Sequence, residues 1–211
     1  MAEDSELRSA LALVDWRRRV FSLYSRIRND ADPEAAWRLW RDVRDALFRD
    51  HQQSPLAVDR RRGFEGIALY PYDPSLRVLA SVTPAKGDAV ELPDSGASPR
   101  LFRRLGWAEF ELGGANQRLG LFWLAEYAGG VFLAFTDATT GGETYDGGRY
   151  LLDTAKGSDL GSVDDRLVLD FNFAYQPSCS YDDHWACPLS PAENRLAVPI
   201  RGGERAPRRD E

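Results

Sequence analysis

The N-terminal part of the chain carries hydrophobic side chains at the spacing of an amphipathic α-helix. In residues 5–28, arginine and aspartate alternate with an apolar face, so this helix is expected to bury one side and expose the charged side. The residues that define the apolar face are Leu7, Leu11, Val14 and Phe21, with Trp16, Val20 and Leu23 alongside.

A second helix is predicted over residues 33–50. The segment "NDADPE" ends the first helix and starts the second. Asp32 is a favourable N-cap, Pro33 fits the first helical turn, and Glu34 suits the positive end of the helix dipole. The apolar face of this helix consists of Trp37, Trp40, Val43 and Leu47. The two helices together predict an N-terminal helical hairpin over residues 1–51.

After "HQQSPL" the hydrophobic period changes from about 3.6 to about 2, which is typical of β-strands. The apolar segments are "FEGIALYPYDP", "LRVLASVT", "WAEFELGG", "RLGLFWLAEY", "GVFLAFTD" and "RLVLDFNFAY". Between them stand glycine-rich turns, so "ELGGANQRLGLFWL" and "LAEYAGGVFLAF" are interpreted as successive hairpins. No βαβ alternation occurs. We therefore predict an α+β fold, mainly β, in which the helical hairpin packs on an antiparallel β-barrel or sandwich.

The β domain is assigned to residues 52–204, with its strands between about 62 and 200. The hairpin and the β domain are expected to form a single folding unit, because the chain has 211 residues and one core can serve that length. The charged end of the chain, residues 205–211, is predicted to be disordered.

Charge and composition narrow the classes of function. The net charge of −6 and the pI near 5.1 disfavour binding to nucleic-acid phosphates, which requires clustered positive charge. The sequence has no run of about 18 apolar residues that could span a membrane. Its N-terminus is acidic and helix-patterned, unlike a signal peptide. We therefore expect a cytoplasmic protein without a nucleic-acid or membrane partner.

The polar stretch 170–204 contains both cysteines of the chain. Cys179, His184 and Cys187 form a C-x4-H-x2-C pattern, but a structural zinc site needs four ligands, usually in two close pairs. A cysteine nucleophile needs a base in reach and a lowered pKa, which proximity in sequence does not establish. We therefore expect no bound metal and interpret both cysteines as buried thiols that lie close together. The prolines that restrict this loop are Pro177, Pro188 and Pro191.

A second polar cluster, residues 135–153, is interpreted as one long turn with two glycine pairs. Solvated charges on a β-turn would explain it. Alternatively, if the strand before this turn lies beside the strand that ends at Asp170, Arg149 and Tyr150 would face Asp170 and Asn172 across the sheet. Such groups at one end of a barrel are typical of small-ligand sites.

A series of motifs resembles the bacterial and archaeal family of unknown function DUF1684. In order, they are "HQQSPL", "YPYDPSLRV", "ETYDGGRYLLD", "LDFNFAYQPSCSY" and "CPLSPAENRLAVPIRGGE". The resemblance runs from the second helix to Glu204, its last three motifs are specific, and it implies no reaction. The pattern of the family does not include His184. It maps here onto Tyr145, Gly147, Gly148, Arg149, Tyr150, Asp170, Phe171, Asn172, Cys179, Cys187, Pro191, Glu193, Asn194, Arg195 and Leu196.

The favoured function is binding of a small molecule in a polar pocket at one end of the barrel, with enzymatic activity left open. Arg149, Asp170 and Asn172 would converge there, with Asn194 or Arg195 joining them. The complete predicted lining is Asp146, Arg149, Tyr150, Asp170, Asn172, Tyr175, Asn194 and Arg195. Asp170 or Asp146 would be the general base, with a pKa raised by burial, and an arginine would hold an anionic group.

The alternative is a non-enzymatic interaction module. In that case the same polar residues brace the fold internally, and Trp16, Trp37 or Trp40 of the helical hairpin contacts a protein partner. No cofactor is expected in either case, since the sequence lacks G-x-S-x-G, H-E-x-x-H, Walker and strand-linked G-x-G-x-x-G motifs.

Overall fold

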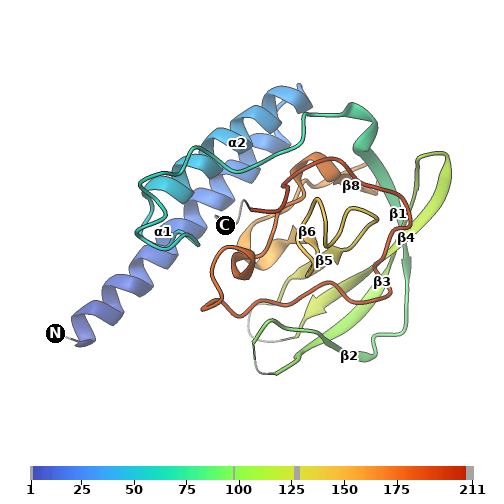
Figure 1. Cartoon of the computed structure of the whole chain (residues 1–211). Coiled ribbons are helices and arrows are strands. Elements are labelled where there is room, and N and C mark those ends of the chain that lie inside the picture. The colour runs from blue at the N-terminus through green and yellow to red at the C-terminus, as the bar shows by residue number, and fades with distance from the viewer. Residues whose placement is uncertain (1, 97, 126–128, 208–211) are drawn as a thin grey trace.

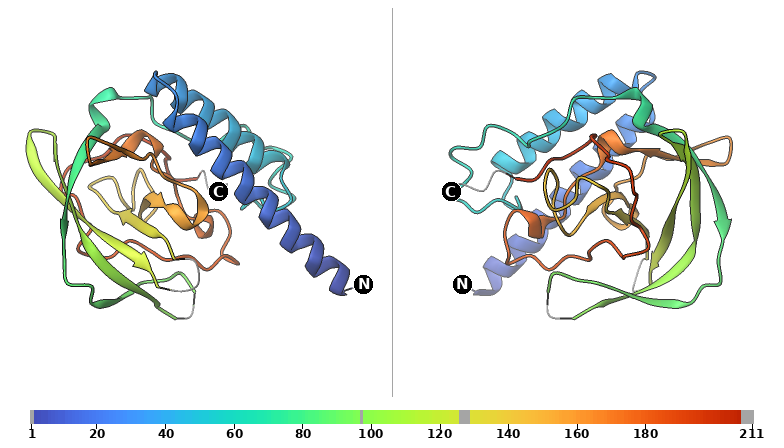
Figure 2. Two further views of the ribbon diagram at one scale, coloured as in Figure 1. Left: turned by 180° about the vertical axis from the view of Figure 1, so that it is seen from behind. Right: turned by 45° about the vertical axis from the view of Figure 1, so that its right-hand side comes forward.

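Two helices lead into a strongly curved β-sheet in the computed structural model, which describes residues 2–96, 98–125 and 129–207 (Figure 1). Helix α1 spans Ala2–Arg28 and helix α2 spans Pro33–Asp50. The carboxylate of Asp32 caps α2 by accepting the backbone N–H groups of Glu34 at 2.9 Å and Ala35 at 3.2 Å. The helices lie side by side as the predicted hairpin (Figure 2). Neither described helix combines the length and apolar composition that crossing a membrane requires.

Only part of the predicted apolar face of α1 packs inward: Trp16, Val20 and Leu23 do so. Leu7, Leu11 and Val14 have relative exposures of 59 %, 60 % and 40 %, whereas Leu23 and Ile27 are buried. At 3.6 residues per turn these two sets lie on roughly opposite sides of the helix. The expectation was wrong for Leu7, Leu11 and Val14 because α1 has two apolar faces, and the N-terminal part of the helix projects beyond the β domain (Figure 2). We call Leu7, Leu11 and Val14 the α1 stripe.

Trp37 and Trp40 hold α2 against the rest of the protein. Trp37 donates its indole N–H to the carbonyl oxygen of Asn172 at 3.0 Å, and Trp40 donates to the hydroxyl of Tyr24 at 3.2 Å. The rings of Trp40 and Phe173 meet edge to face at 5.5 Å. Both indoles are buried, so the expectation that they could contact a partner is wrong: they fill the layer between the hairpin and the chain after the last strand.

The strands form one antiparallel sheet in the order β6-β5-β4-β3-β1-β8-β7, with β2 pairing to β3. Their bounds are β1 Arg77–Pro84, β2 Ala89–Leu92, β3 Arg100–Leu112, β4 Ala115–Leu124, β5 Val131–Phe135, β6 Arg149–Asp153, β7 Ser162–Val163 and β8 Arg166–Asp170. The sheet curls into a half-barrel (Figure 1). The α+β, mainly β prediction is confirmed, and so are the β3–β4 and β4–β5 hairpins. Residues 126–128 of the second turn lie outside the described residues.

Apolar side chains fill the inside of the half-barrel. Phe171 is the centre of this core, with its ring 5.1 Å from that of Phe135 and 5.8 Å from that of Phe110. Leu119 and Leu133 pack in the same cluster and are fully buried. The concave side of the sheet is therefore occupied by the protein itself.

The chain after β8 closes the open side of the half-barrel. This segment, orange to red in Figure 1, crosses the concave face. Tyr175 and Tyr150 exchange two backbone hydrogen bonds of 2.7 and 3.1 Å, which attaches the segment to β6. Further along, the backbone of Arg195 forms an isolated parallel β-bridge with Thr136, the residue that follows β5. The long polar stretch is therefore tied down, as predicted.

Three segments differ from prediction. Residues 64–74, expected as a strand, are irregular and lead into a 3-10 helix at Pro74–Leu76, since proline cannot donate to a strand ladder. Residues 149–153, expected in a turn, form β6, and every residue of this strand is buried. Its sequence therefore lacks the alternation of apolar and polar residues that identifies a half-buried strand. In the charged tail, the N–H of Arg205 donates to the Ala68 carbonyl at 2.8 Å, so its first residues are ordered. Residues 208–211 lie outside the described residues.

Candidate functional site

Most of the residues predicted to line a ligand pocket are buried in the interior. These are Arg149, Tyr150, Asp170, Asn172 and Asn194. Tyr175 is half-buried, whereas Asp146 and Arg195 are exposed. A pocket-lining group keeps part of its surface toward a ligand or solvent, so this burial indicates that the set belongs largely to the interior.

Arg149, the first residue of β6, forms a buried ion pair with Asp137. Its Nη2 donates to Asp137 Oδ2 and to the carbonyl oxygen of Ile200, both at 2.8 Å, and its Nη1 donates to the carbonyl oxygen of Gly202 at 2.5 Å. Burial lowers the pKa of Arg149, and the charge of Asp137 opposes that shift. The guanidinium therefore joins β6 to the end of the C-terminal segment.

Asp170 and Asn172 form a second network where β8 ends. Asp170 Oδ1 accepts the backbone N–H of Asn172 at 3.0 Å and its side-chain Nδ2 at 2.8 Å. Asn172 also pairs with the backbone of Asp73, accepting its N–H at 2.9 Å and donating to its carbonyl at 2.7 Å. These bonds fix the turn after β8 to the residues that precede β1.

Asn194 fills a gap between two strands. Its Oδ1 accepts the N–H of Gly120 on β4 at 2.6 Å, and its Nδ2 donates to the carbonyl oxygens of Gly120 at 3.0 Å and Ala134 on β5 at 2.8 Å. Strands β4 and β5 pair only at Phe122–Phe132 and Trp123–Val131. The amide therefore satisfies backbone groups that the splayed strands leave open.

Arg149, Asp170 and Asn194 do not converge, so the expectation of one pocket-lining cluster is wrong. Strand β6 is the first strand in the sheet order, and β8 lies toward the opposite edge. Each polar group is bonded to a different part of the backbone. The expectation failed because it assumed that these two strands were neighbours, which depends on strand order rather than on local sequence.

A third network, which was not predicted, surrounds Glu204. This side chain is completely buried and forms an ion pair with Arg44 of α2. Its Oε2 accepts the backbone N–H of Gln176 at 2.7 Å and the hydroxyl of Tyr181 at 2.9 Å. The guanidinium of Arg44 also lies over the ring of Tyr175 at 4.9 Å. The sequence contained one sign of this network. Glu204 directly follows a glycine pair in "RGGE", as Arg149 does in "DGGR".

A small cavity of about 150 Å³ reaches Asp170 between the helical hairpin and β8. Arg28 and Arg77 contribute basic groups to its wall, and Phe173 contributes an apolar one. Burial raises the pKa of Asp170, while hydrogen bonds from Asn172 act against this shift. This is the one predicted catalytic residue that combines burial with a cavity in the described pockets.

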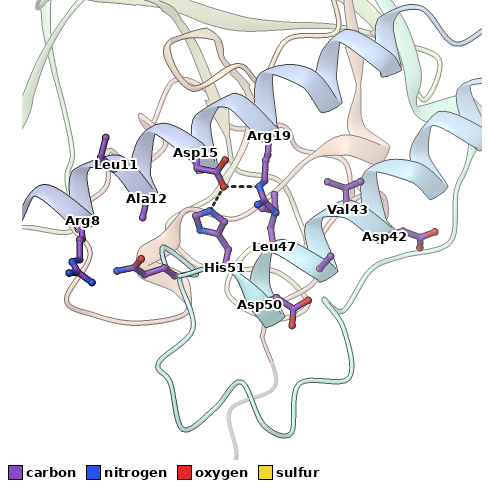
Figure 3. Close-up of a pocket in the computed structure, with 12 residues that line it drawn as sticks. Arg8, Leu11, Ala12, Asp15, Arg19, Asp42, Val43, Leu47, Asp50 and His51 are labelled. Carbon is purple, nitrogen blue, oxygen red and sulfur yellow. Dashed lines mark hydrogen bonds and ion pairs between the residues drawn. The ribbon is translucent and has the colours of Figure 1, made fainter. Parts of the chain in front are cut away.

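A larger groove of about 750 Å³ runs between α1 and α2 (Figure 3). Leu11, Ala12, Val43 and Leu47 give it an apolar lining. Polar and charged side chains also line it: Arg8, Asp15, Arg19, Asp42, Asp50 and His51. Leu11 belongs both to this groove and to the α1 stripe, so the two form one continuous apolar surface.

A polar contact joins the two helices across this groove. His51 Nδ1 accepts the backbone N–H of Gln53 at 3.0 Å, so the neutral imidazole carries its proton on Nε2 and donates it to Asp15 Oδ2 at 3.1 Å. Arg19 binds the same carboxylate oxygen at 2.8 Å (Figure 3). Both partners lower the pKa of Asp15, and the hydrogen bond from His51 has the largest effect. The C-terminus of α2 is thereby fixed to the middle of α1.

Cys179 and Cys187 are both buried, as predicted, and no disulfide joins them in this structure. His184, by contrast, is exposed and bonds Asp182 at 2.8 Å. Within the described residues, no three histidine, cysteine or acidic side chains gather in a way that could hold a metal ion.

The comparisons with known proteins identify the family. Residues 62–205 match the family described as "Protein of unknown function (DUF1684)", so the chain belongs to that family. A solution NMR structure of an uncharacterized protein from gene locus rrnAC0354 of Haloarcula marismortui is 35 % identical. It aligns over 82 % of this chain and 93 % of that one, with a TM-score of 0.59. No curated protein matches the chain. The family match begins after α2, so the helical hairpin lies outside the matched residues.

Proposed function

We propose that this member of the DUF1684 family is a protein-interaction module whose helix α1 binds the α1 helix of a second copy of the chain. The α1 stripe carries the proposal. Its three apolar side chains are exposed on a helix that projects from the domain. A contiguous exposed apolar surface is typical of an interaction site, and anchors at this spacing are what a helical partner uses.

The spacing of the stripe supports a paired helix as the occupant. Leu7, Leu11, Val14, Arg18 and Phe21 follow one another at alternating intervals of four and three residues, which is the seam of a two-stranded coiled coil. Arg18 interrupts the apolar series at one position. Its aliphatic stem can cover an apolar neighbour while the guanidinium stays in water.

Charge complementarity selects the second copy and sets the register. When two α1 helices pair antiparallel about a two-fold axis with Leu11 of each facing Val14 of the other, Arg8 of each copy comes opposite Asp15 of the other on the flank of the seam. Arg8 and Asp15 are both at the border of the α1/α2 groove. The second helix therefore covers the stripe and the neighbouring groove together.

The expected affinity is modest. Full burial of a Leu or Val side chain contributes about 1.5–3 kcal/mol, and these side chains are 40–60 % exposed. Six of them, from two copies, therefore contribute roughly 5–9 kcal/mol before the entropy cost of association is subtracted. Burial of the groove adds to this sum, and we expect a dissociation constant in the micromolar range.

Sedimentation equilibrium from about 1 to about 500 µM protein tests the proposal. The wild type is expected to dimerise, and Leu11→Arg to be monomeric. Arg8→Asp and Asp15→Arg are each expected to be monomeric, because each places like charges opposite one another. An equimolar mixture of these two variants should form a heterodimer, since both ion pairs are then restored, one with the wild-type sign and the other with reversed sign. Leu101→Arg, at a position on β3 that is 56 % exposed, is the matched control and should dimerise like the wild type.

A wild type that stays monomeric throughout this range overturns the proposal. So does a dimer that survives Leu11→Arg, because its interface would lie elsewhere. Failure of the mixture to dimerise contradicts the antiparallel register. Helical circular dichroism of each variant shows that α1 is intact, which matters for Asp15→Arg because Asp15 also binds His51 and Arg19.

A second candidate is binding of a small molecule or ion in the cavity beside Asp170. The observation that favours it is a buried carboxyl group with a raised pKa next to Arg28 and Arg77, an environment that recurs at functional sites. The cavity of about 150 Å³ is smaller than the 300–1,000 Å³ of common ligand sites, so the ligand would have only a few heavy atoms. Any enzymatic activity would use Asp170 as its base.

Thermal melts with small anions and small carboxylic acids test this second candidate. A ligand is expected to raise the melting temperature of the wild type and to leave that of Asp170→Asn unchanged. The asparagine retains an oxygen that can accept the hydrogen bonds of Asn172, so this variant should fold. Absence of any ligand-dependent shift in the wild type, or an equal shift in both proteins, removes the candidate.

A further inference from the structure

The two cysteines are buried where distant parts of the chain meet. Cys179 belongs to a 3-10 helix at Ser178–Ser180, and the backbone N–H of Cys187 donates to Ser95 Oγ at 2.9 Å. The N–H of Ser95 in turn donates to the carbonyl oxygen of Cys187 at 2.9 Å. These two bonds fix the Cys187 end of the loop 179–187, whereas Cys179 is positioned by its 3-10 helix.

The surroundings of Cys179 favour its thiolate. The thiol of Cys187 hydrogen-bonds the Cys179 sulfur, and the hydroxyls of Ser95 and Tyr145 contribute further hydrogen bonds. The Tyr145 oxygen lies 3.6 Å from that sulfur. These hydrogen bonds lower the pKa of Cys179 to about 6, and the one from Cys187 has the largest effect. The hydrogen bond with Cys179, together with burial, raises the pKa of Cys187. One thiol of the pair is therefore prepared to be the nucleophile and the other to remain protonated.

We propose that Cys179 and Cys187 are a redox-active dithiol, in which a small hydroperoxide oxidises Cys179 and Cys187 then closes an intramolecular disulfide. Cys179 is the attacking residue and Cys187 the resolving one. Neither belongs to the α1 surface, so this site is independent of the self-association proposed above.

The reaction balances in two steps. The Cys179 thiolate attacks one peroxide oxygen, the O–O bond breaks, and the departing oxygen takes a proton from solvent, which leaves a sulfenic acid on Cys179. The sulfur of Cys187 then attacks the sulfenic sulfur. The S–O bond breaks, and the hydroxyl leaves as water with the proton of the Cys187 thiol. The two sulfurs lose two electrons in total, and the peroxide bond gains them.

Burial selects the size of the oxidant. Cys179 and Cys187 are only 5 % and 9 % exposed, so a peroxide can approach where a glutathione-sized disulfide cannot. The loop between them carries exposed residues, among them Asp183 and His184. A low-pKa thiol beside a second thiol is the arrangement that reversible thiol oxidation requires.

The test is oxidation of the full chain by hydrogen peroxide, followed by alkylation and mass spectrometry under denaturing conditions. The wild type should lose both alkylatable thiols as one intramolecular disulfide, and dithiothreitol should restore them. Cys187→Ser should stop at the sulfenic acid, which dimedone traps on Cys179. Cys179→Ser should react at least about tenfold more slowly, because the remaining thiol is protonated. Oxidised glutathione should react more slowly than peroxide with the folded protein and at comparable rates with the urea-unfolded protein.

The pH profile and a conservative variant separate this role from packing. The oxidation rate should rise through about pH 6 and then level as Cys179 becomes ionised. The titratable groups that act on the pair are Tyr145 and Tyr150, with Lys156 and Asp146 beyond them. Tyr145→Phe should move this profile to higher pH while leaving the fold intact. Intermolecular disulfides only, no dimedone adduct in Cys187→Ser, or oxidation of both cysteines to sulfinic acid without a disulfide would each overturn the proposal.

Discussion

Replacing Arg149 by alanine measures whether the buried polar residues brace the fold. The substitution removes the guanidinium bonds to Asp137 and to the carbonyl oxygens of Ile200 and Gly202. The relative side-chain exposures of Arg149 and Asp137 are 1 % and 0 %. Alanine at this position therefore leaves a buried carboxylate without its counter-charge and several buried carbonyl groups without their donor.

The expected cost follows from that burial. Removing one partner of a buried ion pair costs roughly 3–5 kcal/mol, because the other charge stays desolvated. Asp137 keeps the N–H and hydroxyl of Thr139 as donors at 2.7 and 2.6 Å, which places the expected value toward the lower half of that range. For a domain of this size, about 1 kcal/mol shifts the melting temperature by about 2–4 °C, so a decrease of roughly 6–15 °C is expected.

Urea denaturation followed by tryptophan fluorescence gives the free energy of unfolding directly. Arg195→Ala is the matched control, because Arg195 is an exposed arginine of the same polar set and should stay within about 0.5 kcal/mol of the wild type. In the double variant with Asp137→Ala, the two losses should be strongly non-additive. A cost below about 1 kcal/mol for Arg149→Ala would refute the bracing role, since a group with such a small cost would already be solvated.

Two further substitutions test the closure of the half-barrel. Glu204→Gln should lower the urea-unfolding free energy by about 2–4 kcal/mol, because it removes the counter-charge of the largely buried Arg44. Gly203→Ala should be far more destabilising than Gly114→Ala in thermal melts, although both residues have a φ of +75°. A Cβ at Gly203 would lie 2.3 Å from the Ala174 carbonyl oxygen, whereas one at Gly114 meets nothing within 4 Å. Equal melting temperatures for the two glycine variants would contradict the close approach.

Local signals were sufficient to predict the elements whose structure depends on their own residues. The Asp32 cap marked the start of α2, and its carboxylate makes the expected bonds. Gly113 and Gly114 marked the β3–β4 turn, and both adopt positive φ. In these cases the decisive interactions join residues close in sequence, so the pattern contains them.

The candidate site depended on contacts that no local pattern contains. Arg149 binds Asp137 and the chain near residue 200, and Asp170 belongs with Asn172 and Asp73. Which partner each side chain finds depends on strand order and on the path of the C-terminal segment. The exposed face of α1 was misassigned for a similar reason: both of its faces are apolar, and only the docking of the helix shows which one is covered.

The buried polar residues have one structural role in common, which explains why they appear together in the sequence. A half-barrel leaves backbone donors and acceptors unpaired at its open side, and buried groups of this kind must find partners. Arg149 satisfies carbonyl groups of the closing segment, Asn194 satisfies those between β4 and β5, and Glu204 fastens the segment to α2. Most of these positions also carry the family resemblance, so that resemblance describes how the half-barrel is closed. We therefore assign the proposed binding and chemistry to other parts of the molecule, namely the exposed stripe of α1 and the buried thiol pair of the loop 179–187.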